Sequence, residues 1–296
     1  MIAISHDTEI IGDVWLNSNG SISLVWEVAK EDLHEVLDFV DKAAYDGNML
    51  QIYCDDYKNE FFVAASFHFY VDFKIPFKEV FKNPKISQNE FYLQITKAEK
   101  RFEDFFRGNV KGFDKWKKIV PEKELEFVYG KQGFFQVKAE GEEKKYGLLV
   151  SLNNFDNIKE IKSFPGITNI ISCKKFLKSE IEEKKERMDS IIAINKAINA
   201  ISTKSKTDEK TQQAHEQIDD LWFFDISYLI QADTLDGVRK LREEFEQHCF
   251  DNGMVLYSHG NSVEQQIKSL YPGMIDKNQH LIIASGEKCK KIIGEM

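Results

Sequence analysis

The sequence predicts an α+β protein built from ferredoxin-like βαβ units in mainly antiparallel sheets, with a helical insertion. Three observations predict it. The segment DDLWFFDISYLIQAD at 219–233 alternates its side chains between two faces from Trp222 to Ala232, as a half-buried strand does. An amphipathic helix pattern follows over 233–251, and a short apolar strand comes next. The same strand, helix, strand order is found earlier, between residues 144 and 172.

The first half opens with a predicted hairpin, because the apolar strands GDVWL and SISLVWEV flank the turn dipeptide Asn19-Gly20. A helix is expected over 31–46, ending at Gly47-Asn48, and the strand MLQIYC follows it. Further strands are expected at 61–73 and 125–138. A long helical pattern over 89–119 is broken at Gly108 and Gly112. This half can be read as a degenerate copy of the second.

The second half contains two βαβ units. The first joins the strand KKYGLLVSL to the strand ITNIIS through a short helix around Ile158 and Ile161. The second begins with the strand in 219–233, on which Asp225, Ser227 and Gln231 are expected to lie on the polar face. Its helix is bracketed by Asp233 and Asp236 like a capping box and ends at Asn252-Gly253. The strand MVLYS, the helix SVEQQIKSL and the stop Tyr271-Pro272-Gly273 complete it.

Two domains are expected. The boundary falls near residue 125, where Pro121 and the charged run EKELE interrupt the apolar pattern. Residues 1–125 would form an α+β subdomain with a basic aromatic helix. Residues 126–296 would form a ferredoxin-like subdomain with its helical insertion at 174–219.

Composition narrows the class of protein. The chain has 296 residues, 42% of them hydrophobic, which is enough for a packed core. Its net charge is −9, shared by both halves, so no nucleic-acid partner is expected. Cys54, Cys173, Cys249 and Cys289 lie far apart without a CxxC pair, which indicates reduced cysteines in a cytoplasmic protein. The N-terminus does not resemble a signal peptide, and no apolar run is long enough to span a bilayer.

No catalytic motif is found. The chain contains no P-loop, GxGxxG, HExxH or GxSxG string, so no catalytic, cofactor-binding or metal-binding residue is predicted and no cofactor is expected. The nearest approach to a P-loop, SGEKCKKIIG at 285–294, has its glycines and lysines in the wrong order and is interpreted as a charged chain end. His248 and Cys249 point about 100° apart on a helix, which disfavours shared metal ligation.

One segment, residues 97–120, combines basic and aromatic residues at helical spacing. Such a helix can lie in an anionic membrane surface or bind a partner, and the same apolar stripe can equally pack on a sheet. The candidate docking residues are Phe102, Phe105, Phe106, Lys111, Phe113, Lys115, Trp116, Lys117 and Lys118.

The order of these strings resembles the N-terminal domain of the type IV secretion and conjugation traffic ATPases, of the VirB/TrbE/CagE type. The resemblance rests on NGSISLVWEV, YGLLVSL, the strand ITNIIS leading into CKKFLKSEIEEKKERM, the unit over 221–256, and Leu270-Tyr271-Pro272-Gly273. In that family a leucine-proline-glycine-asparagine stop precedes the motor domain. Here a tyrosine is inserted in that stop and Met274 takes the place of the asparagine.

The resemblance implies a non-catalytic docking and oligomerisation domain that binds inner-membrane channel subunits and other copies of itself. The family's Walker residues have no counterpart in this chain, so it would be either part of a longer ATPase or a relative without the motor. The expected location is cytoplasmic, with peripheral contact to the inner membrane. The alternative is a stand-alone α+β metal-dependent enzyme or ligand-binding protein with acidic residues at its site.

Overall fold

A computed structural model of the chain describes residues 8–11, 14–17, 19, 21–33, 49–55, 57–68, 117–119, 125–139, 141–153, 164–176, 182, 221–278 and 280–294. The strands of the first half are β1 (Thr8–Ile11), β2 (Val14–Asn17), β3 (Ser21–Glu27), β4 (Met49–Asp55), β5 (Glu60–His68) and β6 (Lys117–Lys118). Those of the second half are β7 (Leu125–Tyr129), β8 (Phe134–Ala139), β9 (Lys145–Leu152), β10 (Ile167–Lys175), β11 (Leu221–Ala232), β12 (Leu256–Ser258) and β13 (Ile282–Ser285). The helices are α7 (Leu235–Asp251), α8 (Val263–Ser269) and α9 (Gly286–Gly294), with short 3₁₀ turns at Lys30–Asp32, Lys131–Gly133, Gly260–Ser262 and Ile275–Lys277.

The predicted α+β class is confirmed. The described strands form a single sheet, whose main path runs β1-β2-β3-β5-β4-β10-β11-β9-β8-β7, and each of their pairings is antiparallel. Strand β4 from the first half pairs with β10 from the second. Hydrogen bonds therefore cross the domain boundary expected near residue 125, although that boundary itself stays a prediction.

The strand order repeats about the middle of the sheet. In the second half β10, β11 and β9 are neighbours in that order, and β12 adds to β9. In the first half β4, β5 and β3 are neighbours in the same order, and β6 adds to β3. A hairpin precedes each set, β1–β2 in one and β7–β8 in the other, and β2 and β8 pair with the equivalent strands β3 and β9. Strand order thus supports reading the first half as a copy of the second.

Two serine pairs mark the relation between the halves. Ser23 on β3 lies 2.7 Å from Ser66 on β5, and Ser151 on β9 lies 2.8 Å from Ser227 on β11, measured between their hydroxyl oxygens. Ser66 is the register partner of Met49, and Ser227 is the register partner of Ile170, so Met49 and Ile170 are equivalent positions. Two residues further along, Gln51 on β4 is therefore equivalent to residue 172 on β10. Those two residues are themselves register partners. If a two-fold axis relates the halves, equivalent residues that lie next to the axis must be paired with each other, as these two are.

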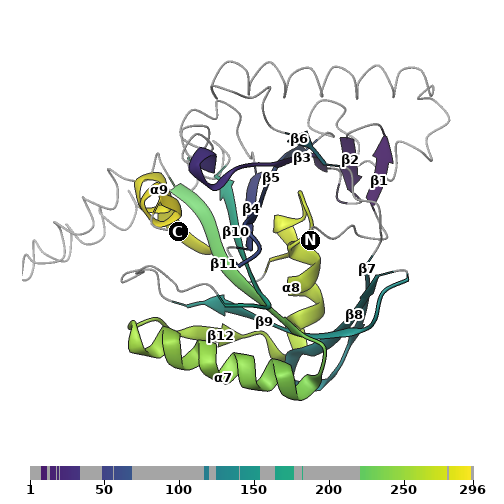
Figure 1. Cartoon of the computed structure of the whole chain (residues 1–296). Coiled ribbons are helices and arrows are strands. Elements are labelled where there is room, and N and C mark those ends of the chain that lie inside the picture. The colour runs from purple at the N-terminus through teal and green to yellow at the C-terminus, as the bar shows by residue number, and fades with distance from the viewer. Residues whose placement is uncertain are drawn as a thin grey trace, which may run out of the picture.

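The sheet is curved, and helices lie on both of its faces (Figure 1). Helix α8 lies on the inner, concave side, while α7 and α9 lie on the outer side. Val238, Phe245 and Cys249 of α7 and Ile292 of α9 belong to the larger apolar core, whereas α8 belongs to a second core with Trp15, Val25 and Leu149. Both faces of the central strands are therefore buried, which explains why β4 is buried along its whole length.

Three sequence expectations are corrected. The single strand expected at 125–138 is a hairpin, because Gln132 (φ 60°) and Gly133 (φ 82°) adopt left-handed backbone between β7 and β8. The N-cap of α7 is Thr234, whose hydroxyl accepts a hydrogen bond from the Gly237 amide at 3.0 Å, so the bracket by aspartates was wrong. Strand β10 continues to Lys175, into the expected insertion; the rest of 174–219 lies outside the described residues apart from Phe176 and Glu182.

Strand β11 differs from its prediction in a way that matters for the site. Its polar face is not exposed to solvent: Asp225 and Ser227 are both 0% exposed. The segment 259–280, which includes α8, covers this face, so β11 is buried on both sides. Alternation located the two faces correctly, but a covering segment from elsewhere in the chain turned the polar one into an interior surface.

Candidate functional site

Most of the predicted docking residues lie outside the described part of the chain. Phe102, Phe105, Phe106, Lys111, Phe113, Lys115 and Trp116 belong to this group. Lys117 and Lys118 form β6, which pairs with Trp26 and Glu27 of β3, so the helix expected over 97–120 does not extend to them. Main-chain hydrogen bonds to β3 replace the last helical turn at these residues. The Lys117 side chain is exposed.

The Tyr271-Pro272-Gly273 stop is bound to the first half of the chain. The side-chain amide of Asn17 donates to the Pro272 carbonyl at 2.8 Å, and that of Asn19 donates to the Gly273 carbonyl at 2.9 Å. Gly273 itself has φ +79°, and a Cβ built on it would lie 2.5 Å from the hydroxyl of Ser21. This Pro-Gly turn therefore packs directly against β2 and β3.

Two side chains of β4 hold the approach to the Pro-Gly turn. Gln51 accepts a hydrogen bond from the Gly273 amide at 2.9 Å and donates to the Ser269 carbonyl at 3.0 Å. Tyr53 donates its hydroxyl to the Leu270 carbonyl at 2.7 Å. Burial raises the pKa of the Tyr53 phenol well above its ordinary value, so the hydroxyl remains a donor. The end of α8 is thus fixed to the inner face of the sheet.

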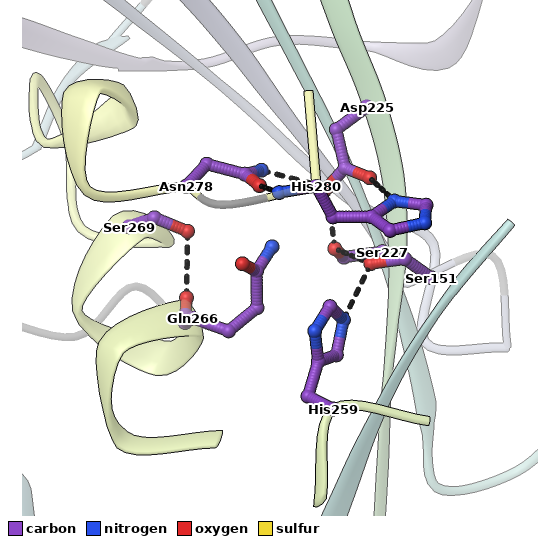
Figure 2. Close-up of polar contacts among 8 residues, drawn as sticks. All are labelled: Ser151, Asp225, Ser227, His259, Gln266, Ser269, Asn278 and His280. Carbon is purple, nitrogen blue, oxygen red and sulfur yellow. Dashed lines mark hydrogen bonds and ion pairs between the residues drawn. The ribbon is translucent and has the colours of Figure 1, made fainter. Parts of the chain in front are cut away.

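A second group of polar side chains, the β11 polar cluster, comprises Ser151, Asp225, Ser227, His259, Asn278 and His280 (Figure 2). Asp225 Oδ2 accepts hydrogen bonds from Ser227 at 2.6 Å and from the Asn278 amide at 3.0 Å. Its other oxygen lies 3.4 Å from His280 Nδ1. Tyr257 stacks on the His280 ring, with ring centroids 4.8 Å apart. The cluster joins β9 and β11 to the loops on both sides of α8.

The order of donors in this cluster fixes the tautomer of His259. A hydroxyl carries one hydrogen, and Ser227 donates its own to Asp225. Ser151, 2.8 Å away, must therefore donate to Ser227, and it can only accept from His259 Nε2, also at 2.8 Å. The chain of hydrogen bonds runs from the imidazole through two hydroxyls to the carboxylate. This direction is opposite to that of a nucleophilic serine, which donates to its histidine.

The burial of Ser151 and His259 also argues against a nucleophilic serine. Ser151 is 0% exposed and His259 4% exposed, so no substrate can approach the hydroxyl. Burial of the imidazole lowers the pKa of His259 to about 4, which keeps it neutral near pH 7. The arrangement is suited to holding segments together and not to acyl transfer.

A cavity of about 100 Å³, the inner cavity, lies on the concave face between the β7–β8 hairpin, strands β4, β10 and β11, and the end of α8. Its lining divides by exposure. The buried part is mainly apolar, and the exposed part is charged. The cavity is lined by residues that include Tyr53, Phe127, Ile170, Leu229, Ile267 and Tyr271, and its polar lining residues include Lys58, Glu142, Glu143, Lys145, Thr168 and Gln231.

Three exposed apolar residues that lie close together in the sequence, Phe250, Val255 and Tyr257, are called the edge patch. Their exposed fractions are 76%, 53% and 45%, and they lie within eight consecutive residues at the end of α7 and the start of β12. Strand β12 pairs with β9 along one edge; no described strand pairs with its other edge. Sequence reasoning missed these exposed residues because MVLYS predicts only a short strand, with no indication of which side chains it exposes.

The four cysteines are buried, and none of them forms a disulfide bond. Burial raises the pKa of Cys249 to about 12 and that of Cys173 well above its ordinary value, so these thiols are poor nucleophiles and metal ligands. Within the described ranges, no three His, Cys, Asp or Glu side chains gather in a metal-binding arrangement. The described helices are all too short or too polar to span a bilayer.

Comparison of the sequence with protein-family models and with curated proteins finds no match in either set.

Proposed function

We propose that this chain is a non-catalytic docking module that binds another protein. In the setting that the resemblance implies, the partner is an inner-membrane subunit of a type IV secretion or conjugation system. The edge patch is the observation that carries the proposal: Phe250, Val255 and Tyr257 expose large apolar side chains at one end of the second ferredoxin-like unit. Large apolar side chains grouped on a surface mark sites of protein interaction.

The edge patch combines two features that binding surfaces use. Aromatic side chains such as Phe250 and Tyr257 supply most of the binding energy when a partner covers them. The outer edge of β12, to which no described strand is bonded, can accept an extended segment of a partner through main-chain hydrogen bonds. Tyr257 is already held in place by stacking on His280, so little side-chain entropy remains to be lost on binding.

The β11 polar cluster supports the non-catalytic part of the proposal. It is the described group that most resembles catalytic machinery, because it contains serine, histidine and aspartate side chains in contact. Ser151 accepts from His259 instead of donating to it, and both are buried. The same side chains bind the segment 259–280 to the sheet, which is sufficient reason for their presence.

The proposal is tested with the purified chain and detergent-solubilised inner-membrane subunits of the secretion system, by biolayer interferometry. Replacing both Phe250→Ser and Tyr257→Ser should weaken binding at least tenfold, since buried interface aromatics are worth roughly 2 kcal/mol each. Val128→Ser is the matched control, because Val128 is 55% exposed on β7 and lies outside the patch. Wild-type protein that binds none of the subunits, or a double variant that binds as tightly as wild type, would refute the proposal.

The basic aromatic segment 97–120 is a second docking surface proposed from the sequence. If it binds an anionic membrane or a partner, Phe105→Glu with Trp116→Glu should reduce recovery in the membrane fraction, because two charges replace apolar contacts. Circular dichroism checks that the double variant folds. Unchanged folding with unchanged recovery would show that the segment packs inside the protein.

A further inference from the structure

The inner cavity has the lining of a small-molecule site. Its buried walls carry apolar side chains from β7, β8, β10 and the end of α8, namely Leu125, Val137, Ala139, Ile170, Ile267 and Leu270. An apolar cavity of 150 Å³ holds a benzene ring, so one of about 100 Å³ has room for roughly four carbon atoms. A branched aliphatic group of that size would fill it, and a flat ring or a nucleotide base would not.

The mouth of the inner cavity carries charges of both signs. Glu142 and Glu143 come from the turn before β9, Lys145 begins β9, and Lys58 lies in the turn between β4 and β5. Lys58 already binds the buried carboxylate of Asp55 at 2.8 Å. Glu143 and Lys145 form no ion pair with any described residue. With respect to the described residues, one carboxylate and one ammonium group are therefore available at the same opening.

Two neutral side chains complete the mouth. The Thr168 hydroxyl on β10 and the Gln231 amide on β11 line the cavity, and neither makes a side-chain hydrogen bond within the described part of the chain. Both are partly buried, so a ligand rather than bulk water can satisfy them at modest cost. The opening thus offers a donor and an acceptor beside the pair of opposite charges.

From this combination we propose that the inner cavity binds a free α-amino acid with a branched aliphatic side chain. The side chain occupies the apolar part, the ligand carboxylate pairs with Lys145, and the ligand ammonium pairs with Glu143. A fatty acid or an alkylamine would match only one of the two charges. None of these residues belongs to the edge patch, so this proposal and the docking proposal fail separately.

Isothermal titration of the full chain with L-leucine tests the proposal. Each buried methylene is worth about 0.8 kcal/mol, or about fourfold in affinity, so L-alanine should bind roughly fifty-fold more weakly than L-leucine. The analogues 4-methylpentanoate and 3-methylbutylamine each lack one charge and should bind roughly two- to fivefold more weakly, as exposed ion pairs contribute. N-acetyl-L-leucine amide, which has neither charge, should bind weakest of the branched compounds.

Variants assign the binding to this cavity. Ala139→Phe should abolish L-leucine binding, because the added ring occupies the cavity. Lys145→Gln should weaken L-leucine but leave 3-methylbutylamine unchanged, while Lys138→Gln, an exposed residue on β8 outside the lining, changes neither. The proposal would be overturned if L-leucine, L-isoleucine and L-valine showed no saturable binding at ligand concentrations up to about 10 mM. Undiminished binding to folded Lys145→Gln, or equal binding of N-acetyl-L-leucine amide, would also overturn it.

Discussion

Replacing Gly273 with alanine should destabilise the protein far more than the same change at Gly253. Both glycines have left-handed backbone, with φ +79° and +72°, so each variant carries the same backbone penalty of about 1 kcal/mol. At Gly253 nothing lies within 4 Å of the added Cβ. At Gly273 the Cβ would lie 2.5 Å from the Ser21 and Ser23 hydroxyls and 2.6 Å from the Asn17 amide nitrogen. Glycine is thus required at position 273 by close packing as well as by its left-handed backbone, and at position 253 only by its backbone.

The magnitude follows from the hydrogen bonds that must be lost. Relief of the contact separates the Pro-Gly turn from β2 and β3, which breaks the bond from Asn17 to the Pro272 carbonyl and the bond from the Gly273 amide to Gln51. Each loss leaves buried polar groups without partners and costs about 1–3 kcal/mol. Gly253→Ala should therefore lower the free energy of unfolding by about 1 kcal/mol, and Gly273→Ala by about 4 kcal/mol.

Urea unfolding followed by tryptophan fluorescence measures both variants, since Trp15, Trp26 and Trp222 are buried in different parts of the sheet. Asn17→Ala provides a double-mutant cycle: because it removes one of the same hydrogen bonds, its effect should not add to that of Gly273→Ala. Equal losses of stability at Gly253 and Gly273, or fully additive losses in the cycle, would refute the role assigned to the Pro-Gly turn.

Three further outcomes follow from the interior of the sheet. Burial lowers the pKa of His259 from an unfolded value near 6.5 to about 4, so between these pH values the unfolded chain binds a proton that the folded chain does not. The free energy of unfolding should therefore fall by up to about 3 kcal/mol as the pH drops from 6.5 to 4. Urea unfolding at several pH values should show this fall for the wild type and a smaller one for His259→Gln. Nitrogen-correlated NMR at pH 7 should show His259 protonated on Nε2 alone; the Nδ1 tautomer would contradict the direction of the hydrogen bonds. Gln51→Met should cost about 2 kcal/mol in thermal or urea unfolding because two hydrogen bonds are lost, and a loss below 0.5 kcal/mol would contradict the bridging role.

The parts of this fold that the sequence predicts are those with local causes. The alternation in 221–232, the apolar stripe of α7 and the dipeptide Asn19-Gly20 each act within a few residues, and strand β11, helix α7 and the β2–β3 hairpin are present as predicted. The errors have nonlocal causes. Lys117 and Lys118 follow a helical pattern, but the available edge of β3 gives them strand partners. A sequence pattern records what a segment can form, and it does not record which neighbour will satisfy its backbone.

The site shows the same limit. Alternation placed Asp225 and Ser227 on a common face, and the polar identity of that face suggested solvent. What buries them is the segment 259–280, which brings Asn278 and His259 to meet them. No spacing within 221–232 encodes this contact. The signal that could have found it is the number of polar side chains in 259–280, because such a segment must find interior hydrogen-bond partners when it is buried.

The two-fold order of strands explains why the segment 259–280, which follows β12, contributes hydrogen bonds to both halves of the sheet. Each half presents a serine pair and other polar groups on the concave face, and strand pairing alone would leave those groups facing a void. The segment 259–280 supplies partners to both: Asn278 and His259 to the second half, and the Pro-Gly turn to Asn17 and Gln51 of the first. A single extension beyond the repeat therefore supplies hydrogen-bond partners to buried polar groups of both units. Changes at the Pro-Gly turn should consequently loosen the contact between the halves before they disturb either half alone, since no hydrogen bond within β9–β11 depends on Gly273.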